Sequence, residues 1–328
     1  MSTSARTGAV TANRGPSRVD PDASVVICSY AEARWDTLVE AVDALRRQTL
    51  SPAQIIVTVD HNVGLLRRAA SGLPGVEVVA NEEESGLSGA RNTGLRHARG
   101  EIVAFLDDDA RPEPAWLAAL VDAFDDPAVV GAGGLALPEW VDGPRPEWLP
   151  AEMYWVIGCS YTGLPAQRAE IRNPIGANMA FRRDALLAVG GFVDGIGRVG
   201  TVPLGCEETE LAIRVRDVTG GTVLHVPDAR VQHRVTAARV TWRYFLSRCW
   251  AEGLSKALVA AHVGSGAALA SERTYAIRVL PRGATRGVLD ALRGDRRGMA
   301  RAVAIVAGLA VTTAGYVVGA VRRRVFGS

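Results

Sequence analysis

The stretch Ile-Val-Ala-Phe-Leu-Asp-Asp-Asp at residues 102–109 decides how this chain is interpreted, because an apolar run ends there in three adjacent carboxylates. A short apolar run of this kind has the length of a buried strand. Neighbouring carboxylates repel one another, and burying even one ionised carboxylate without a partner costs several kcal/mol. The stretch therefore predicts a buried strand whose end meets positive charge.

The same type of pattern recurs on the N-terminal side of this stretch. Apolar, largely β-branched runs lie at residues 25–30, 55–60 and 76–79, and helical spacing of apolar residues appears over residues 35–48 and 88–99. Strands that alternate with helices are typical of βαβ units. The expected fold class is therefore α/β, with a mostly parallel central sheet flanked by helices.

Three of the predicted strands end in polar or acidic residues. Ligands of open α/β sheets bind beyond the carboxyl ends of the strands, so these ends predict one shared crevice. Asp and Asn are also common in turns, which remains an alternative for any single strand end. The three ends are Ser29-Tyr30-Ala31-Glu32, Asp60-His61-Asn62 and Asp107-Asp108-Asp109.

Asp107 and Asp109 occupy alternate positions and offer oxygen ligands for a hard divalent cation. Proteins hold Mg²⁺ and Mn²⁺ through one or two carboxylates together with substrate phosphates, so either ion is the expected cofactor. Pro112 and Pro114 follow and prevent the strand from continuing. Asp108 has no role in this interpretation, and its replacement by serine is expected to be tolerated better than the loss of either neighbour.

Several other function classes lack their signatures. No GxGxxG follows the first strand, and the sequence contains neither GxxxxGK[ST] nor GxSxG. The formal net charge is only +2 and no dense basic stripe is present, so no nucleic-acid partner is expected. The four cysteines form no CxxC pair, which favours reduced thiols in the cytosol. What remains is phosphate held by a metal and by basic groups such as Arg91.

In the order and spacing of its motifs, the chain resembles the family 2 glycosyltransferases, which are inverting enzymes with the A-type glycosyltransferase fold. The resemblance covers residues 24–235. The segments that carry it are Val25–Glu32, Ile55–Asp60, Gly89–Gly94, Ala98–Glu101, Phe105–Asp109, Gly176–Arg182, Gly190–Phe192 and Gly205–Leu211.

The resemblance implies a hexosyltransferase-type enzyme that moves a sugar from a nucleotide-diphosphate sugar, a UDP-sugar before other donors, to an acceptor hydroxyl or a lipid phosphate. Inversion requires one in-line displacement assisted by a carboxylate. The nucleotide-sugar site that the resemblance implies consists of Ser29, Tyr30, Glu32, Asp60, Arg91 and Asp107.

The resemblance also implies a metal site, a base and an acceptor side. Glu208 would be the general base, in a segment that usually reads Glu-Asp in this family. Here it reads Glu-Glu, so whether Glu207 or Glu208 faces the acceptor stays open. The metal ligands would be Asp107, Asp109 and His233. The acceptor side would contain Gly176, Asn178 and Glu207.

The chain divides into four predicted parts. Residues 1–23 form a disordered tail without a signal-peptide h-region. Residues 24–240 form the catalytic domain, whose nucleotide-binding half is 24–130 and whose acceptor half is 131–240. Residues 241–301 form an amphipathic, basic helical extension. The fourth part is a C-terminal apolar helix.

This helix covers residues 302–321, which contain no charged residue and are about long enough to span a bilayer core. Ala, Val and Gly dominate, so the drive for insertion is small, and a span, an in-plane helix and a buried packing helix all remain open. Gly315 and Gly319 have the GxxxG spacing that allows close helix approach. Arginine clusters on both sides suit anionic headgroups. We expect a membrane-associated enzyme at the cytoplasmic face, with a lipid-linked or saccharide acceptor.

Two alternative functions remain open from the sequence. One is a nucleotidyltransferase on a related fold, although its N-terminal Gly-rich loop is missing. The other is a catalytically silent membrane scaffold that retains the fold, against which the joint presence of Asp107, Asp109 and Glu208 counts.

Overall fold

A nine-stranded sheet positions the candidate site. The computed structural model describes residues 22–198 and 204–326. The tail predicted for residues 1–23 lies outside these ranges except at its end, where the prediction is wrong in one detail: Ala23 already belongs to the first strand, because it pairs with Ile102.

The strand order of the sheet is β3-β2-β1-β4-β8-β6-β9-β5, and β7 pairs with β9. The strands β3, β2, β1 and β4 pair in parallel, as do β6 and β9, whereas β8 is antiparallel to β4 and β6. The predicted α/β class is confirmed, and the parallel part holds the strands that the sequence indicates. The strands are β1 (Ala23–Ser29), β2 (Gln54–Val59), β3 (Glu77–Ala80), β4 (Ile102–Asp107), β5 (Ala110–Pro112), β6 (Val129–Trp140), β7 (Ala169–Glu170), β8 (Asn178–Arg182) and β9 (Thr222–Val235).

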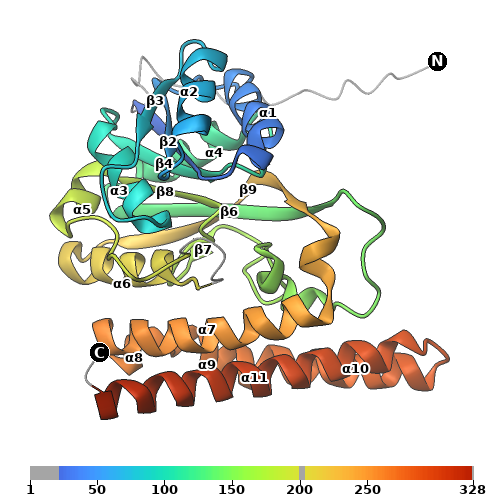
Figure 1. Cartoon of the computed structure of the whole chain (residues 1–328). Helices are drawn as coiled ribbons and strands as arrows, with labels where there is room; N and C mark the ends of the chain where they lie inside the picture. Colours follow the sequence, from blue (N-terminus) through green and yellow to red (C-terminus); the bar gives the residue numbers. More distant parts are fainter. Residues whose placement is uncertain (1–21, 199–203, 327–328) are drawn as a thin grey trace, which may run out of the picture.

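Helices cover both faces of this sheet (Figure 1). Successive residues of a strand point to opposite faces. Accordingly, Val25 and Ile27 pack in one apolar cluster with α1 and α4, whereas Val26 packs in a second cluster with α3 and α6. The helices of this part are α1 (Trp35–Arg46), α2 (Val63–Gly72), α3 (Leu87–His97), α4 (Trp116–Asp122), α5 (Arg183–Ala188) and α6 (Glu207–Thr219), with the 3-10 helices η1 (Glu32–Arg34), η2 (Ala123–Asp125), η3 (Ala151–Ile157) and η4 (Ala237–Val240).

The C-terminal part forms a separate helical layer on one side of the sheet, in which α7 and α11 lie side by side (Figure 1). A Cβ added at Gly253 would meet the backbone of Thr312, and one added at Gly315 would meet the backbone of Trp250. Glycine therefore allows the two helices to approach closely. The helices are α7 (Trp242–Val263), α8 (Ser265–Ala268), α9 (Ala270–Thr274), the π-helix η5 (Tyr275–Val279), α10 (Leu280–Leu292) and α11 (Arg297–Phe326).

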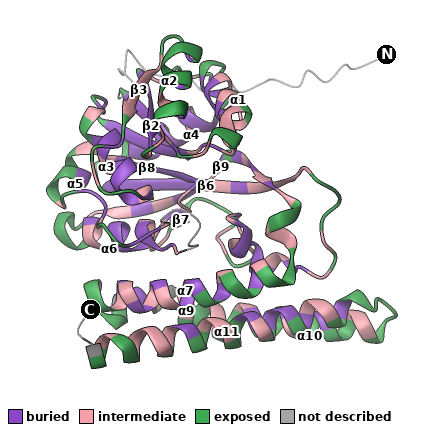
Figure 2. Cartoon of the chain, in the orientation of Figure 1, coloured by how far each residue is buried: buried purple, intermediate pink, exposed green. Residues whose placement is uncertain are grey.

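The helix α11 is long and apolar enough to cross a membrane, judged by length and composition. Within Arg297–Val325, a window of 18 residues has a mean hydropathy of 1.9, and 28% of that window is buried. Figure 2 shows exposed and half-buried residues along the side of α11 that faces away from α7. The large exposed apolar residues in the described part of α11 are Met299, Val303, Val306, Leu309, Val317, Val321 and Val325.

Candidate active site

The carboxyl ends of β1, β2 and β4 meet at one edge of the sheet. Cys28 of β1 pairs with Thr58 on one side and with Asp107 on the other, so the residues that follow these strands come together. They open into a cavity of about 930 Å³ whose lining includes Tyr30, Asp60 and Asp107. The predicted shared crevice is present in the fold.

A cluster of two carboxylates and one imidazole lies at this edge. β5 and β9 pair antiparallel with Ala110 opposite His233, which brings the imidazole to the end of β4. Nε2 of His233 lies 3.4 Å from Oδ1 of Asp109 and 4.0 Å from Oδ2 of Asp107. The ligand atoms of the three residues all lie within 4.8 Å of one another, so the cluster could hold a metal ion.

The protonation states of this cluster suit a cation. Burial would raise the pKa of Asp109, but nearby positive charge, including the guanidinium groups of Arg239 and Arg34, outweighs burial and holds that pKa well below its ordinary value. Nη2 of Arg239 donates to Oδ2 of Asp109 at 2.9 Å, which leaves Oδ1 directed at His233. Burial lowers the pKa of His233, which favours the neutral imidazole that metals require. Carboxylate oxygens from Asp107 and Asp109 together with a neutral imidazole fit a divalent ion such as Mn²⁺.

Asp108 has a structural role, so the expectation that it has none is wrong. It is the most buried member of the triplet, its Oδ2 accepts from Oγ of Ser29 at 2.6 Å, and it forms an ion pair with Arg34. Burial raises the pKa of Asp108 to about 6, against the opposing effect of Arg34. Asp108 therefore connects the end of β4 to β1 and η1 through buried contacts, which serine is too short to reproduce.

Two polar side chains that the sequence analysis did not single out hold residues at these strand ends. Asn81, which follows β3, donates from Nδ2 to Oδ1 of Asp60 at 2.7 Å, and the backbone N–H of Gly86 donates to its Oδ2 at 3.0 Å. The guanidinium of Arg34 lies 5.3 Å from the ring centroid of Tyr30. The only local signal for Asn81 was its place directly after a predicted strand.

Arg91 joins several elements at the centre of the site. Its Nη1 donates to Oε1 of Glu207 at 2.8 Å, and its Nη2 donates to the carbonyl of Gly176 at 3.0 Å. Nη2 also lies 3.5 Å from Oδ1 of Asp107. Arg91 and Glu207 are both buried. Glu207 is therefore an internal partner of Arg91, and Asp107 connects this pair to the cluster that contains Asp109 and His233.

Glu208 is in a different environment from its neighbour. It lies in the first turn of α6 and lines the cavity, and within the described ranges it has no ion-pair partner. Burial raises the pKa of Glu208 to about 8, and the charge of Glu207 adds to the increase. A carboxylate with a pKa near the working pH and access to a cavity is suited to general-base chemistry.

Two predicted site residues do not reach the cavity. Glu32 is an exposed residue of η1, and Asn178 is fully buried in β8. The amide of Asn178 donates to the carbonyls of Leu135 and Ala229 and accepts from Nε1 of Trp116. The geometry therefore does not support an acceptor contact by Asn178, because its polar atoms are used within the core.

The far wall of the cavity comes from the C-terminal helical layer, which the sequence did not connect to the site. α7 contributes charged residues, and η3, η5, α10 and α11 contribute an apolar wall. This apolar wall includes Met153, Ile157, Val279, Leu280, Leu309 and Tyr316.

Comparison with known proteins identifies the fold and the chemistry. Residues 24–190 match the model of Glycosyl transferase family 2. The glucosyl-dolichyl phosphate glucuronosyltransferase of Haloferax volcanii is 34% identical over 237 residues, which cover 71% of this chain and 75% of that protein. Glycosyltransferase AglE of the same organism is 30% identical over 120 residues, covering 35% and 39% of the two chains.

Solved structures show the same fold. The mannosyltransferase PcManGT from Pyrobaculum calidifontis, in complex with GDP-Man and Mn²⁺, matches 90% of this chain and 87% of its own, with a TM-score of 0.52 and 21% identity. GalNAc-T7 with UDP, GalNAc and Mn²⁺ matches 73% of this chain and 48% of its own, with a TM-score of 0.50 and 19% identity. The predicted A-type fold is confirmed, and the nucleotidyltransferase and silent-scaffold alternatives are set aside. The chain belongs to glycosyltransferase family 2 and is a glycosyltransferase.

Proposed function

We propose that this enzyme transfers a sugar from a nucleotide-diphosphate sugar, a UDP-sugar in the first instance, to a lipid-linked acceptor with inversion at the anomeric carbon. The observation that carries the proposal is the presence of two chemically different groups in one cavity. The cluster of Asp107, Asp109 and His233 suits a metal-bound diphosphate, and Glu208 suits an acceptor hydroxyl.

The metal site would use Asp107, Asp109 and His233, and Mn²⁺ is the ion that this mixed donor set favours. Bound there, the ion would neutralise charge on the diphosphate leaving group. Arg239 keeps Asp109 ionised, and the buried surroundings keep His233 neutral. Asp60, held by Asn81, would orient the nucleoside on the opposite side of the strand ends.

The proton of the acceptor would pass to Glu208. Of the two adjacent glutamates, Glu207 is bound to Arg91 at 2.8 Å, whereas Glu208 faces the cavity without an ion-pair partner among the described residues. Inversion by single displacement requires one carboxylate base and no second nucleophile. Because Glu207 is held in an ion pair by Arg91, it is not free to act as a second nucleophile, which favours inversion and favours Glu208 as the base.

The acceptor proposal rests on the apolar wall of the cavity. From Glu208 the lining continues to residues of η5, α10 and α11, such as Val279, Leu280 and Leu309. An apolar wall beside a polar reaction centre suits an acceptor that carries a hydrocarbon chain. The name of the Haloferax volcanii relative, a glucosyl-dolichyl phosphate glucuronosyltransferase, agrees with an acceptor of this class.

We further propose that α11 lies in the plane of the cytoplasmic membrane surface. Its packing against α7 through Gly253 and Gly315 ties it to the catalytic part of the chain, whereas its other side exposes valine residues. The basic residues at both ends of α11 suit anionic headgroups. An apolar face of this kind on a helix fixed along its length favours an in-plane arrangement over a span.

Binding to vesicles tests the membrane arrangement. We expect the protein to sediment with phosphatidylglycerol vesicles, and we expect Val306→Glu combined with Val317→Glu to weaken this binding by about tenfold or more, because each glutamate must be kept out of the apolar layer. Val218→Glu, an exposed valine on α6, is the matched control. Equal binding by the wild type and the double variant would contradict the in-plane arrangement.

The reaction itself is tested with a panel of UDP- and GDP-sugars, Mn²⁺ and a glycosylated polyprenyl phosphate in detergent. We expect transfer from an α-linked donor to give a β-linked product, identified by NMR of the anomeric proton. A retained configuration would contradict single displacement by Glu208. Transfer only to water-soluble acceptors would contradict the lipid-linked acceptor and leave the rest of the reaction standing.

A further inference from the structure

The turn that begins α6 is unusual, because it lacks the ordinary means of capping a helix. Its N-cap residue, Cys206, has φ of +70°, a left-handed conformation that non-glycine residues rarely adopt, and its side chain makes no capping hydrogen bond. Helices normally begin with Ser, Thr, Asp or Asn, whose side chains cap the first turn. Because Glu207 and Glu208 follow directly, whatever holds this turn also sets the direction of the proposed base.

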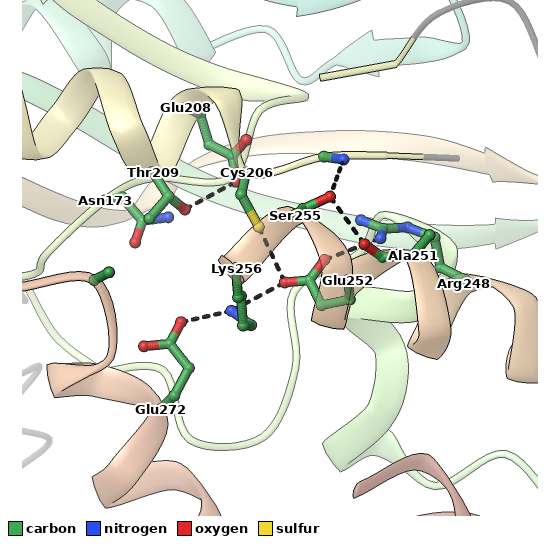
Figure 3. Close-up of polar contacts among 12 residues, drawn as sticks. Asn173, Cys206, Glu208, Thr209, Arg248, Ala251, Glu252, Ser255, Lys256 and Glu272 are labelled. Carbon is green, nitrogen blue, oxygen red and sulfur yellow. Dashed lines mark hydrogen bonds and ion pairs between the residues drawn. The ribbon is translucent and has the colours of Figure 1, made fainter. Parts of the chain in front are cut away.

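The turn is held from outside by two residues of α7 (Figure 3). Oγ of Ser255 accepts from the backbone N–H of Gly205 at 3.1 Å and donates to the carbonyl of Ala251 at 2.9 Å. Sγ of Cys206 donates to Oε1 of Glu252 at 3.3 Å. Ser255 and Glu252 are one helical turn apart, so the same side of α7 contacts two successive residues of the turn.

Glu252 is itself fixed by charged neighbours. Nη1 of Arg248 lies 2.9 Å from its Oε2, and Nζ of Lys256 lies 3.0 Å from its Oε1. Lys256 also reaches Oε1 of Glu272 at 2.6 Å, and Nη2 of Arg172 reaches the same oxygen at 2.8 Å. Burial would raise the pKa of Glu252, but Lys256 and Arg248 outweigh it and hold it at about 2. Glu252 is thus a fixed anion at neutral pH and a stable acceptor for Cys206.

We propose that Ser255 and Glu252 are positioning residues for the transfer reaction: from α7 they hold the Gly205–Cys206 turn and thereby aim Glu208 into the cavity. This inference rests on the proposed role of Glu208. It places part of the catalytic apparatus in the helical extension beyond residue 240. The energetic reason is direct, since a left-handed residue without a cap has a low intrinsic stability and needs external hydrogen bonds to persist.

The first test replaces Ser255 by alanine. We expect Ser255→Ala to lower kcat by about tenfold, the effect of one lost buried hydrogen bond, with the KM for the donor unchanged because the strand-end residues are untouched. Ser247→Ala, an exposed serine of the same helix, is the matched control. A wild-type kcat for Ser255→Ala would overturn the inference.

A double variant separates positioning from general weakening of the fold. If Ser255 acts through Glu208, then Ser255→Ala has no further effect on kcat in a Glu208→Gln background, whereas a purely structural defect lowers kcat by the same factor in both backgrounds. Full turnover by Glu208→Gln alone would overturn the proposed base and this inference with it. If Glu208→Gln loses turnover and Ser255→Ala lowers kcat by the same factor in the wild-type and Glu208→Gln backgrounds, the inference is overturned but the proposed base is not.

Cys206 gives an independent readout on Glu252. Cys206→Ser keeps a donor for Oε1 of Glu252 and is expected to stay within about twofold of wild-type kcat. Cys206→Ala must adopt the same left-handed backbone conformation but lacks a donor for Glu252. Its kcat is expected to fall by about fivefold or more. Equal kcat values for the two variants would show that the contact with Glu252 does not position the turn.

Discussion

Replacing Glu208 by glutamine is expected to lower kcat by about 10²- to 10⁴-fold, the range over which a positioned general base contributes. Glutamine has nearly the same shape, so donor binding at Asp60 and Asp107 should be preserved. Steady-state transfer assays with saturating donor and Mn²⁺ measure kcat. Calorimetric titration with the nucleotide diphosphate measures donor binding. Glu40→Gln, a half-exposed glutamate of α1, serves as control.

Although Glu208→Gln is expected to lower kcat, it is expected to raise the stability of the fold. Burial raises the pKa of Glu208 from 4.5 to about 8 in the folded protein. The protonated form therefore contributes stability that is present below pH 4.5 and is lost as the pH rises through about 8. Glutamine does not ionise, so the Tm of Glu208→Gln should exceed that of the wild type increasingly between these pH values. Melting curves in EDTA test this, and a constant Tm difference across the range would contradict the assignment.

The pH dependence of transfer follows from the same pKa. A base must be deprotonated to accept the acceptor proton, so kcat/KM of the wild type should rise with pH and level off above about pH 8. The residual activity of Glu208→Gln should not show this rise of kcat/KM with pH.

The second large effect concerns the acidic triplet. Replacing Asp109 should lower Mn²⁺-dependent transfer, whereas replacing Asp108 should lower the stability of the fold. Asp109→Asn removes a charged oxygen directed at His233 and is expected to lower Mn²⁺-dependent transfer by about 10²- to 10³-fold, the usual cost of losing one preorganised charge-stabilising group. The apparent affinity for Mn²⁺, measured by electron paramagnetic resonance, should fall with it. The fold should be retained because the side-chain carbonyl oxygen of Asp109→Asn can still accept from Nη2 of Arg239.

Asp108→Asn is the matched comparison. It disturbs the buried contacts with Ser29 and Arg34, so we expect a loss of about 1–3 kcal/mol in the free energy of unfolding and a Tm lower by several degrees. Mn²⁺ affinity should remain close to that of the wild type. If Asp108→Asn and Asp109→Asn lost Mn²⁺ affinity equally, the division between a structural and a metal-binding aspartate would be wrong.

The convergence of the strand ends could be predicted from the sequence, for a physical reason. Parallel strands end at the same edge of a sheet, so a polar residue placed directly after each apolar run is enough to bring Asp60, Tyr30 and Asp107 to one crevice. The resemblance to a known family added His233 and Glu208, which no local pattern would have placed there.

The remaining contacts could not be predicted because local periodicity shows which side of a segment is buried but not what it packs against. Asn178 lies just after Gly176 in the segment that the resemblance assigns to the acceptor side, yet antiparallel pairing with β4 turns its amide into the core. The left-handed conformation of Cys206 has no signal in the sequence, since cysteine is not a residue that favours it. Its supports, Glu252 and Ser255, lie far along the chain.

The close backbone packing of α11 on α7 has a practical consequence for producing this enzyme. Removing residues 297–328 to obtain a more soluble protein would uncover the side of α7 on which Gly253 and Cys249 are buried. The opposite side of that helix holds the turn before Glu208. Detergent or lipid nanodiscs around the intact chain are therefore better suited to enzymology than truncation.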